Sequence, residues 1–218
     1  MARTLVLDLD GTLVDTLPDL AAALNRLMTG RGLSAFASAE VAVMIGDGVA
    51  VLVERAFAAR ALPVDPAALA DFLADYGAHV ACASRAFPGV AETLATLVGR
   101  DWRLAVCTNK PESAARRLLA TLGLGDYFAA IGGGDSFPVR KPDPAHLLAT
   151  IAAAGGSPAR ALMVGDHRND IAAAAGAAIP CVFAAWGYGA PEMAAGAAAV
   201  ANRFRDLLAL TERLVPPT

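Results

Sequence analysis

Short runs of apolar residues alternate along this chain with stretches that repeat apolar residues at helical spacing, and this alternation limits the fold more than any other feature. Each run is short, continuous and closed by polar or turn residues, which is typical of a strand buried on both faces. Such strands, separated by helices, predict an α/β fold with a parallel sheet covered on both sides. The expected strands are residues 4–7, 103–107, 161–164 and 179–183, and the expected helices are about 90–99, 112–122, 143–154 and 168–176.

One long segment interrupts this alternation with helical patterns alone. The patterns cover residues 18–29, 38–60 and 66–80. The segment begins at Thr16 to Asp19, which resembles a helix start with a capping box. We therefore predict a core formed by residues 1–15 and 87–218, and an inserted helical cap formed by residues 16–86.

The composition excludes several classes of protein. Apolar residues make up 56% of the 218 positions, which argues against disorder, and the net charge of −3 argues against a nucleic-acid or anionic-membrane surface. The three cysteines form no CxxC pair, so neither a disulfide framework nor a zinc site is expected. Glycines and a proline interrupt the longest uncharged run, residues 171–191. We predict a soluble cytoplasmic protein that binds neither nucleic acid nor membrane, and the sequence leaves its oligomeric state open.

Two aspartates follow the first expected strand, in Asp8-Leu9-Asp10-Gly11-Thr12. Residues two apart on an extended backbone point to the same side, so Asp8 and Asp10 would converge on one site. Two such carboxylates repel each other unless a cation holds them together, which favours a metal or phosphoryl site. A simple Asp-Gly turn, with the carboxylates capping exposed amides, is the alternative.

A second acidic pair follows the third expected strand, in Gly165-Asp166-His167-Arg168-Asn169-Asp170. Asp166 at the strand tip is a natural hard-oxygen ligand for a metal ion, and Asp170 could orient that ligand from the first helical turn. The alternative for Asp170 is a carboxylate that only complements the helix dipole.

The lysines are few and lie beside the same loops. The chain contains two lysines and sixteen arginines, and Lys141 stands between Arg140 and Pro142. In a chain that otherwise uses arginine, Lys141 suggests a function that requires a compact ammonium group. Lys110, after Thr108-Asn109, is interpreted as a solvated loop residue. Three carboxylates, a hydroxyl, an amide and an ammonium group together predict Mg2+-assisted phosphoryl transfer to a carboxylate.

These four segments, in this order, resemble the signature of the haloacid dehalogenase superfamily, and in particular its phosphatases with a helical cap after the first motif. The resemblance covers essentially the whole chain and implies a Rossmann-like core. It implies that Asp8 is the nucleophile, that Asp10 is the general acid and base, and that Mg2+ is held by Asp8, the Asp10 carbonyl and Asp166. By the same resemblance Thr108 and Asn109 would hold phosphate oxygens, and Lys141 would neutralise charge beside Asp8.

The cap segment from Met44 to Val49 and on to Ala56 is similar to phosphoglycolate phosphatases. This implies hydrolysis of a small phosphorylated metabolite, with 2-phosphoglycolate as the favoured substrate. Arg55 and the amides around Gly46 are the candidates for binding the substrate carboxylate. His167 departs from the subfamily's usual small polar residue and is expected to face solvent. His79 and His146 are interpreted as surface residues.

Other functions remain open at this point. A broad-specificity phosphatase acting on sugar phosphates, nucleotides or pyrophosphate has the same signature. Asp10 argues against a dehalogenase, which resembles this chain but lacks the second aspartate. Residues 16–86 contain no lysine, which excludes phosphonate cleavage through a cap lysine and weakens a phosphomutase reading. Outside the enzymes, a phospho-acceptor signalling domain also clusters aspartates, a threonine and a lysine on a parallel sheet.

Overall fold

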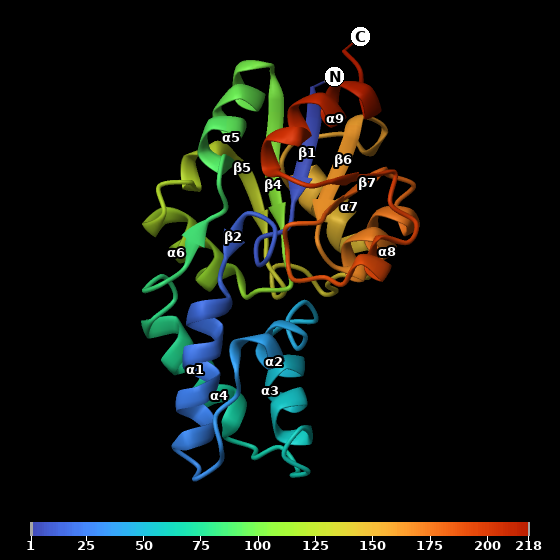
Figure 1. The fold of residues 1–218 in the computed structure, drawn as a ribbon. Helices are drawn as coiled ribbons and strands as arrows, with labels where there is room; N and C mark the ends of the chain where they lie inside the picture. Colours follow the sequence, from blue (N-terminus) through green and yellow to red (C-terminus); the bar gives the residue numbers. More distant parts are fainter. Residues whose placement is uncertain (1, 218) are drawn as a thin grey trace.

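The computed structural model describes residues 2–217, and its core is a six-stranded sheet whose neighbouring strands are all parallel. The strands lie in the order β5-β4-β1-β6-β7-β8 (Figure 1). Their bounds are β1 Arg3–Leu7, β4 Trp102–Cys107, β5 Phe128–Gly132, β6 Ala161–Gly165, β7 Cys181–Ala184 and β8 Ala199–Ala201. The predicted parallel α/β fold is confirmed, and β1 lies between β4 and β6 near the centre of the sheet.

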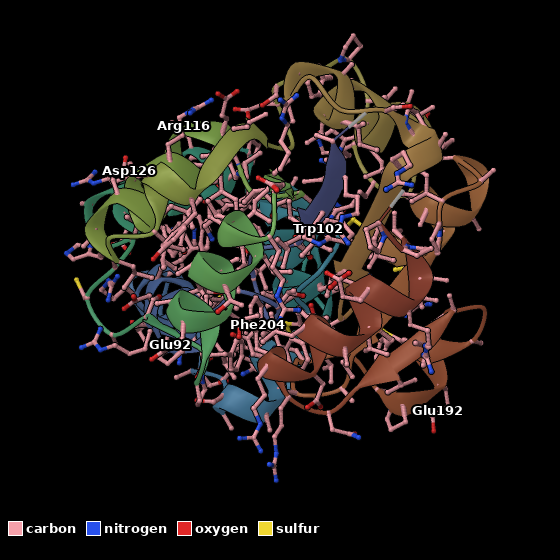
Figure 2. All side chains as sticks on the ribbon, turned by 90° about the horizontal axis from the view of Figure 1, so that it is seen from above. Glu92, Trp102, Arg116, Asp126, Glu192 and Phe204 are labelled. Atoms are coloured by element: carbon pink, nitrogen blue, oxygen red, sulfur yellow. The ribbon has the colours of Figure 1, made fainter. Side chains whose placement is uncertain are left out.

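Helices cover both faces of this sheet. Successive side chains of each strand point to opposite faces, so each strand contributes apolar residues to the core on both sides. Leu5 and Leu7 of β1 belong to one apolar cluster, which also contains residues of α5, α6 and α9. Val6 belongs to a second cluster, with residues of α7 and α8. Seen from above, Trp102 and Phe204 lie inside the molecule, whereas Arg116 and Glu192 project outward (Figure 2). The helix bounds are α5 Val90–Gly99, α6 Glu112–Thr121, α7 Pro144–Ala153, α8 Arg168–Gly176 and α9 Leu207–Leu214.

A helical cap lies beyond the carboxyl end of the sheet, as the helical insertion predicted (Figure 1). A short antiparallel ribbon, β2 (Val14–Asp15) with β3 (Arg85–Ala86), connects the cap to the core. The domain boundaries at residues 15/16 and 86/87 remain a prediction, and they fall at the ends of this ribbon. The cap helices are α1 Leu17–Thr29, α2 Ser38–Ala42, α3 Val49–Ala58 and α4 Ala68–Ala78.

Several helices and strands of the structure differ from the sequence prediction. The single helix expected over residues 38–60 is two helices, because Gly46 and Gly48 adopt φ angles of +118° and +91° and break the helical path. The strands β5 and β8 were not predicted, since both are rich in alanine and lie at the sheet edges.

Within residues 2–217, no helix combines the length and the apolar character that a membrane crossing requires.

The predicted capping box at the start of α1 does not form, and the N–H groups of Thr16 and Leu17 donate to the Tyr188 hydroxyl at 2.7 and 2.9 Å. The side chain of Thr16 makes no capping hydrogen bond. Asp19 is 4% exposed, and its carboxylate accepts hydrogen bonds from Ala83 N at 2.9 Å, Ser84 N at 2.8 Å and Ser84 Oγ at 2.7 Å. These bonds join the chain where it enters the cap to the chain where it leaves it.

Replacing Asp19 with Ala should therefore destabilise the protein by roughly 2–4 kcal/mol, because several buried donors lose their acceptor. The matched control is Asp71→Ala, which removes an exposed carboxylate paired with Arg31 at 2.6 Å and should cost less than about 1 kcal/mol. Urea unfolding of the two variants measures both values. Similar small losses in both variants would show that Asp19 does not tie the two cap connections together.

Candidate active site

The carboxyl ends of β1, β4 and β6 bring the polar residues of the sequence motifs to one place. Asp8 and Asp10 follow β1, and Asp166 follows β6. The residues after β4 and the loop before α7 complete the group, which also lies against the cap loop between α2 and α3. The core residues gathered here are Asp8, Asp10, Thr108, Asn109, Lys110, Lys141, Asp166 and Asp170.

Lys141 connects two of the carboxylates. Its Nζ lies 2.9 Å from Asp8 Oδ1 and 2.6 Å from Asp170 Oδ1, and its side chain is 1% exposed. Burial opposes the charged ammonium, but Asp170 and Asp8 outweigh it and raise the pKa of Lys141 above its ordinary value. The second oxygen of Asp170 accepts the His167 N–H at 3.0 Å. Lys141 is therefore held as a cation against Asp8.

Asp8, Asp166 and Asp170 form a buried acidic cluster, with one carboxylate oxygen of each within 4.8 Å of the others. Burial, followed by the charge of neighbouring carboxylates, raises the pKa of Asp166 to about 8. Burial likewise raises the pKa of Asp8 to about 6, although Lys141 opposes this shift. One lysine does not balance three buried carboxylates, so the donor set fits a small divalent cation that prefers oxygen ligands.

Asp166 is fixed by groups that the sequence did not single out. Its Oδ1 accepts the Thr12 hydroxyl at 2.9 Å, and its Oδ2 accepts the Tyr188 N–H at 2.8 Å. Gly11 is required in this packing, since its φ is +80° and a Cβ there would overlap the Asp166 carboxylate. The backbone of the first motif therefore lies directly against the side chain of Asp166.

Thr108 and Asn109 differ in their surroundings. The Thr108 hydroxyl accepts the Lys110 N–H at 3.2 Å and is buried beside the cavity. The Asn109 amide donates to Lys141 O at 2.9 Å and to Gly46 O in the cap loop at 3.1 Å. Asn109 thus joins the loop of the buried lysine to the cap.

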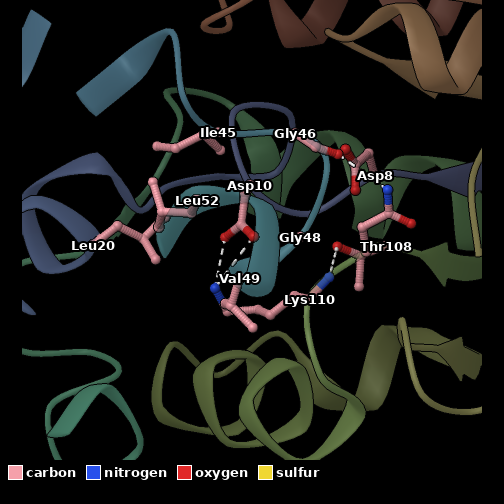
Figure 3. A pocket seen from close by; sticks show the side chains of 11 residues that line it. Asp8, Asp10, Leu20, Ile45, Gly46, Gly48, Val49, Leu52, Thr108 and Lys110 are labelled. Atoms are coloured by element: carbon pink, nitrogen blue, oxygen red, sulfur yellow. Dashed lines mark hydrogen bonds and ion pairs between the residues drawn. The ribbon is translucent and has the colours of Figure 1, made fainter. Parts of the chain in front are cut away.

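Lys110 is buried, contrary to its interpretation as a solvated loop residue. Its Nζ donates to both oxygens of Asp10, at 2.9 and 3.2 Å (Figure 3). The same Nζ lies 4.6 Å from the centre of the Tyr76 ring in α4. Burial opposes its charge, but Asp10 and Tyr76 outweigh it and raise the pKa of Lys110. Both lysines of the chain therefore belong to the site.

The two substrate-binding candidates in the cap have different positions. Gly46 lines the cavity, and a Cβ at this position would lie 2.6 Å from the His167 ring, so a glycine lets the cap loop approach the core. Arg55 is turned into the cap, where it donates to Met44 O at 2.9 Å and pairs with Asp47. Arg55 is not among the described residues that line either cavity beside Asp8 and Asp10.

Two of the histidine predictions are wrong. His167 is 7% exposed and accepts the Asn169 N–H at the start of α8, instead of facing solvent. His146 is fully buried: its Nδ1 accepts the Lys141 N–H at 3.1 Å, and its Nε2 lies 3.0 Å from Gly133 O. Leu147 and Ile151 are one helical turn apart, and His146 lies beside this apolar pair on α7, which could have indicated that it is buried. His79 is exposed, as predicted.

Comparisons with known proteins show the family of the chain. A family model described as haloacid dehalogenase-like hydrolase matches residues 2–178. The chain belongs to this family. The phosphoglycolate phosphatase of Agrobacterium fabrum is 46% identical over 188 residues, which cover 84% of this hydrolase and 80% of that protein. The phosphoglycolate phosphatase of Rhodospirillum rubrum is 43% identical over 216 residues, covering 95% and 90%.

The solved structures agree on the fold of the hydrolase. The crystal structure of a predicted phosphoglycolate phosphatase from Haemophilus somnus 129pt has a TM-score of 0.88 to it at 32% identity, with 96% of this chain and 98% of that chain covered. The match includes the cap as well as the sheet, because it spans almost the whole of both chains.

The buried His146 of the hydrolase makes its stability depend on pH. Burial and the Lys141 ammonium lower the pKa of His146 to about 4. The folded protein thus holds this ring neutral at a pH where the unfolded chain, with an ordinary pKa near 6.5, binds a proton. The stability that the neutral ring contributes is therefore present above about pH 6.5 and is lost as the pH falls towards about 4.

We expect the wild type to lose stability relative to His146→Gln between about pH 7 and about pH 5, by up to about 1.4 kcal/mol per pH unit. Urea unfolding at three pH values in this range measures the difference. His79→Gln, at an exposed histidine, is the control and should follow the wild type. A constant difference between wild type and His146→Gln would mean that folding leaves the pKa of His146 unchanged.

Proposed function

We propose that this hydrolase is a Mg2+-dependent phosphomonoesterase that hydrolyses 2-phosphoglycolate through an aspartyl-phosphate on Asp8. The observation that carries the proposal is the environment of the Asp8 carboxylate. Its Oδ1 accepts the Leu9 N–H at 2.7 Å and lies 2.9 Å from Lys141 Nζ. Within residues 2–217, no hydrogen bond ends on its Oδ2. One oxygen is oriented and the other is free to attack phosphorus.

The proposed reaction has two steps. In the first, an oxygen of Asp8 forms a bond to phosphorus while the bond to the ester oxygen breaks, and Asp10 gives that oxygen its proton. In the second, Asp10 takes a proton from water as the water oxygen attacks the aspartyl-phosphate, which releases phosphate and restores Asp8. Lys141 neutralises charge beside Asp8 throughout, and Thr108 and Asn109 hold phosphate oxygens.

The metal ion has a defined place in this proposal. Asp8, the Asp10 carbonyl and Asp166 would hold Mg2+, and Asp170 would position Lys141 and the His167 backbone. Asp170 is the least available of the three clustered carboxylates, because it is fully buried and one of its oxygens pairs with the Lys141 ammonium, whereas the Asp166 oxygens accept only from neutral donors, the Thr12 hydroxyl and the Tyr188 N–H. Mg2+ would supply positive charge that lets a phosphate dianion approach the carboxylates.

The choice of substrate rests on the relatives and on the cap. The phosphoglycolate phosphatases of Agrobacterium fabrum and Rhodospirillum rubrum are similar over most of the chain. Apolar cap residues, Leu20, Ile45 and Leu52, line the cavity beside Asp10 (Figure 3). This lining favours a small ester over a sugar phosphate or a nucleotide. A phospho-acceptor domain needs no such cap, and its phosphoryl group would not be turned over.

The first test is phosphate release from 2-phosphoglycolate, sugar phosphates, nucleotides and pyrophosphate, with Mg2+ and with EDTA. We expect Mg2+-dependent hydrolysis with a clear preference for 2-phosphoglycolate. Asp8→Asn should lower kcat by more than about 10³-fold with the fold intact, because an amide oxygen is a poor nucleophile. Broad, weak hydrolysis would contradict the substrate, and turnover by Asp8→Asn would contradict the nucleophile.

A second test measures the metal without turnover. At a Mg2+ concentration about 100-fold above Kd, the melting temperature of the wild type should rise by about 5–10 °C. Asp166→Asn should lose this rise, because a neutral amide replaces a carboxylate that would hold the cation. The exposed Asp126→Asn is the control and should keep the full rise. An equal rise in Asp166→Asn would place the metal elsewhere.

A further inference from the structure

A substrate with a carboxylate as well as a phosphate needs a second cation or a set of donors, and the cavity contains one cationic side chain in its lining. The core contributes Asp8, Asp10 and Lys110 as charged residues, and the cap contributes no charged side chain to this lining. Lys141 is not among the residues that line this cavity, and it pairs with two carboxylates, Asp8 and Asp170, whereas Lys110 pairs with one, Asp10. Among the described residues that line this cavity, Lys110 therefore carries the only positive charge (Figure 3).

The position of Lys110 suits a ligand that extends from the phosphoryl site towards the cap. Its backbone N–H bonds to Thr108, on the side where phosphate oxygens are expected. Its ammonium lies at the other end, against Asp10 and over the ring of Tyr76 in the cap. One side chain thus spans the distance between the phosphate side and the cap.

The ammonium also has a donor to offer. Lysine carries three N–H donors, and two contacts reach the Asp10 oxygens at 2.9 and 3.2 Å. The face of the Tyr76 ring takes no conventional hydrogen bond, and the side chain of Lys110 is 1% exposed, so water contributes little. A carboxylate that enters the cavity would meet a cation with little hydration to lose.

We propose that Lys110 binds the carboxylate of the substrate, and so selects small phosphate esters that carry an anionic group close to the ester oxygen. This inference rests on the proposed function and names the residue that binds the carboxylate of the leaving group. It assigns to Lys110 the part that the sequence motifs suggested for Arg55, which is held inside the cap by Met44 O and Asp47. The apolar residues Leu20, Ile45 and Leu52 would leave the hydroxyls of a sugar without partners.

The test compares two substrates of the same size, 2-phosphoglycolate and its neutral amide, carbamoylmethyl phosphate. The wild type should prefer the carboxylate by at least 50-fold in kcat/KM. Lys110→Met should bring this ratio close to one, chiefly by raising KM for 2-phosphoglycolate, and Lys110→Arg should retain part of it. Arg55→Met is the matched control, and it should keep the wild-type ratio whatever its effect on the two rates.

Lys110 also contacts Asp10, and a role limited to that contact predicts a different result. Lys110→Met would then lower kcat for both substrates by the same factor and leave their ratio unchanged, which would overturn the proposal. A wild type that hydrolyses both esters equally would also overturn it, while the phosphatase activity would stand. Hydrolysis of neither ester would instead contradict the proposed function.

A binding measurement decides the role of Lys110 without turnover. In the Asp8→Asn background, calorimetry with 2-phosphoglycolate and with inorganic phosphate measures the contribution of the carboxylate. Lys110→Met should weaken binding of 2-phosphoglycolate by at least 30-fold and change binding of phosphate by less than three-fold. Equal weakening of both ligands would show that Lys110 does not distinguish the carboxylate.

Discussion

The buried ion pairs of Lys141 with Asp8 and Asp170 are the interaction on which the rest of the site depends. Transfer of three charged groups from water to a protein interior is unfavourable unless they are close and hydrogen-bonded. The structure meets this condition from three distant segments: the end of β1, the loop before α7 and the first turn of α8. The His146 ring then holds the backbone N–H of Lys141, and His167 donates its backbone N–H to Asp170. These contacts fix the lysine against one oxygen of Asp8.

The cap is joined to this arrangement by amide groups of the core. Asn109 and Asn169 both donate to Gly46 O, at 3.1 and 3.3 Å, and Asn169 also donates to Asp47 at 2.7 Å. The cap loop between α2 and α3 therefore lies over the buried carboxylates and excludes water from them. This matters for catalysis, because fixed charges act more strongly in a site that excludes water.

The sequence predicted the parts of the fold that depend on local pattern. The apolar runs of β1, β4 and β6 predicted a parallel sheet, and the carboxyl ends of parallel strands lie at one edge. Asp8 and Asp166 could be expected together for this reason, whereas Lys141 was singled out by the scarcity of lysine in the chain. The edge strands β5 and β8 escaped prediction, because alanine is a weak strand former and the strand pattern is correspondingly faint.

The other differences arise from tertiary contacts that no local pattern contains. Lys110 is buried between two distant parts of the chain. Its ammonium bonds to Asp10, which lies 100 positions earlier, and contacts the ring of Tyr76 in the cap. Asn169 contacts Asp47 across 122 positions, and Asp19 contacts Ser84 across 65. In an isolated segment each of these polar side chains would be solvated. Only the fold of the whole chain places its hydrogen-bond partner beside it.

The central place of β1 also has a consequence for how the chain folds during synthesis. β1 is made first, yet its two neighbours are β4 at residues 102–107 and β6 at residues 161–165. β1 and the two aspartates that follow it are therefore without their first partner strand until residue 107 is made, and without the second until residue 165. Pairings between such distant segments close slowly, since the ordering of a long intervening chain precedes the contacts that stabilise it. The helices of the cap follow β1 in the chain and are made before β4 and β6. Their apolar faces are therefore the first that can cover β1 and keep it from contact with other unfolded chains.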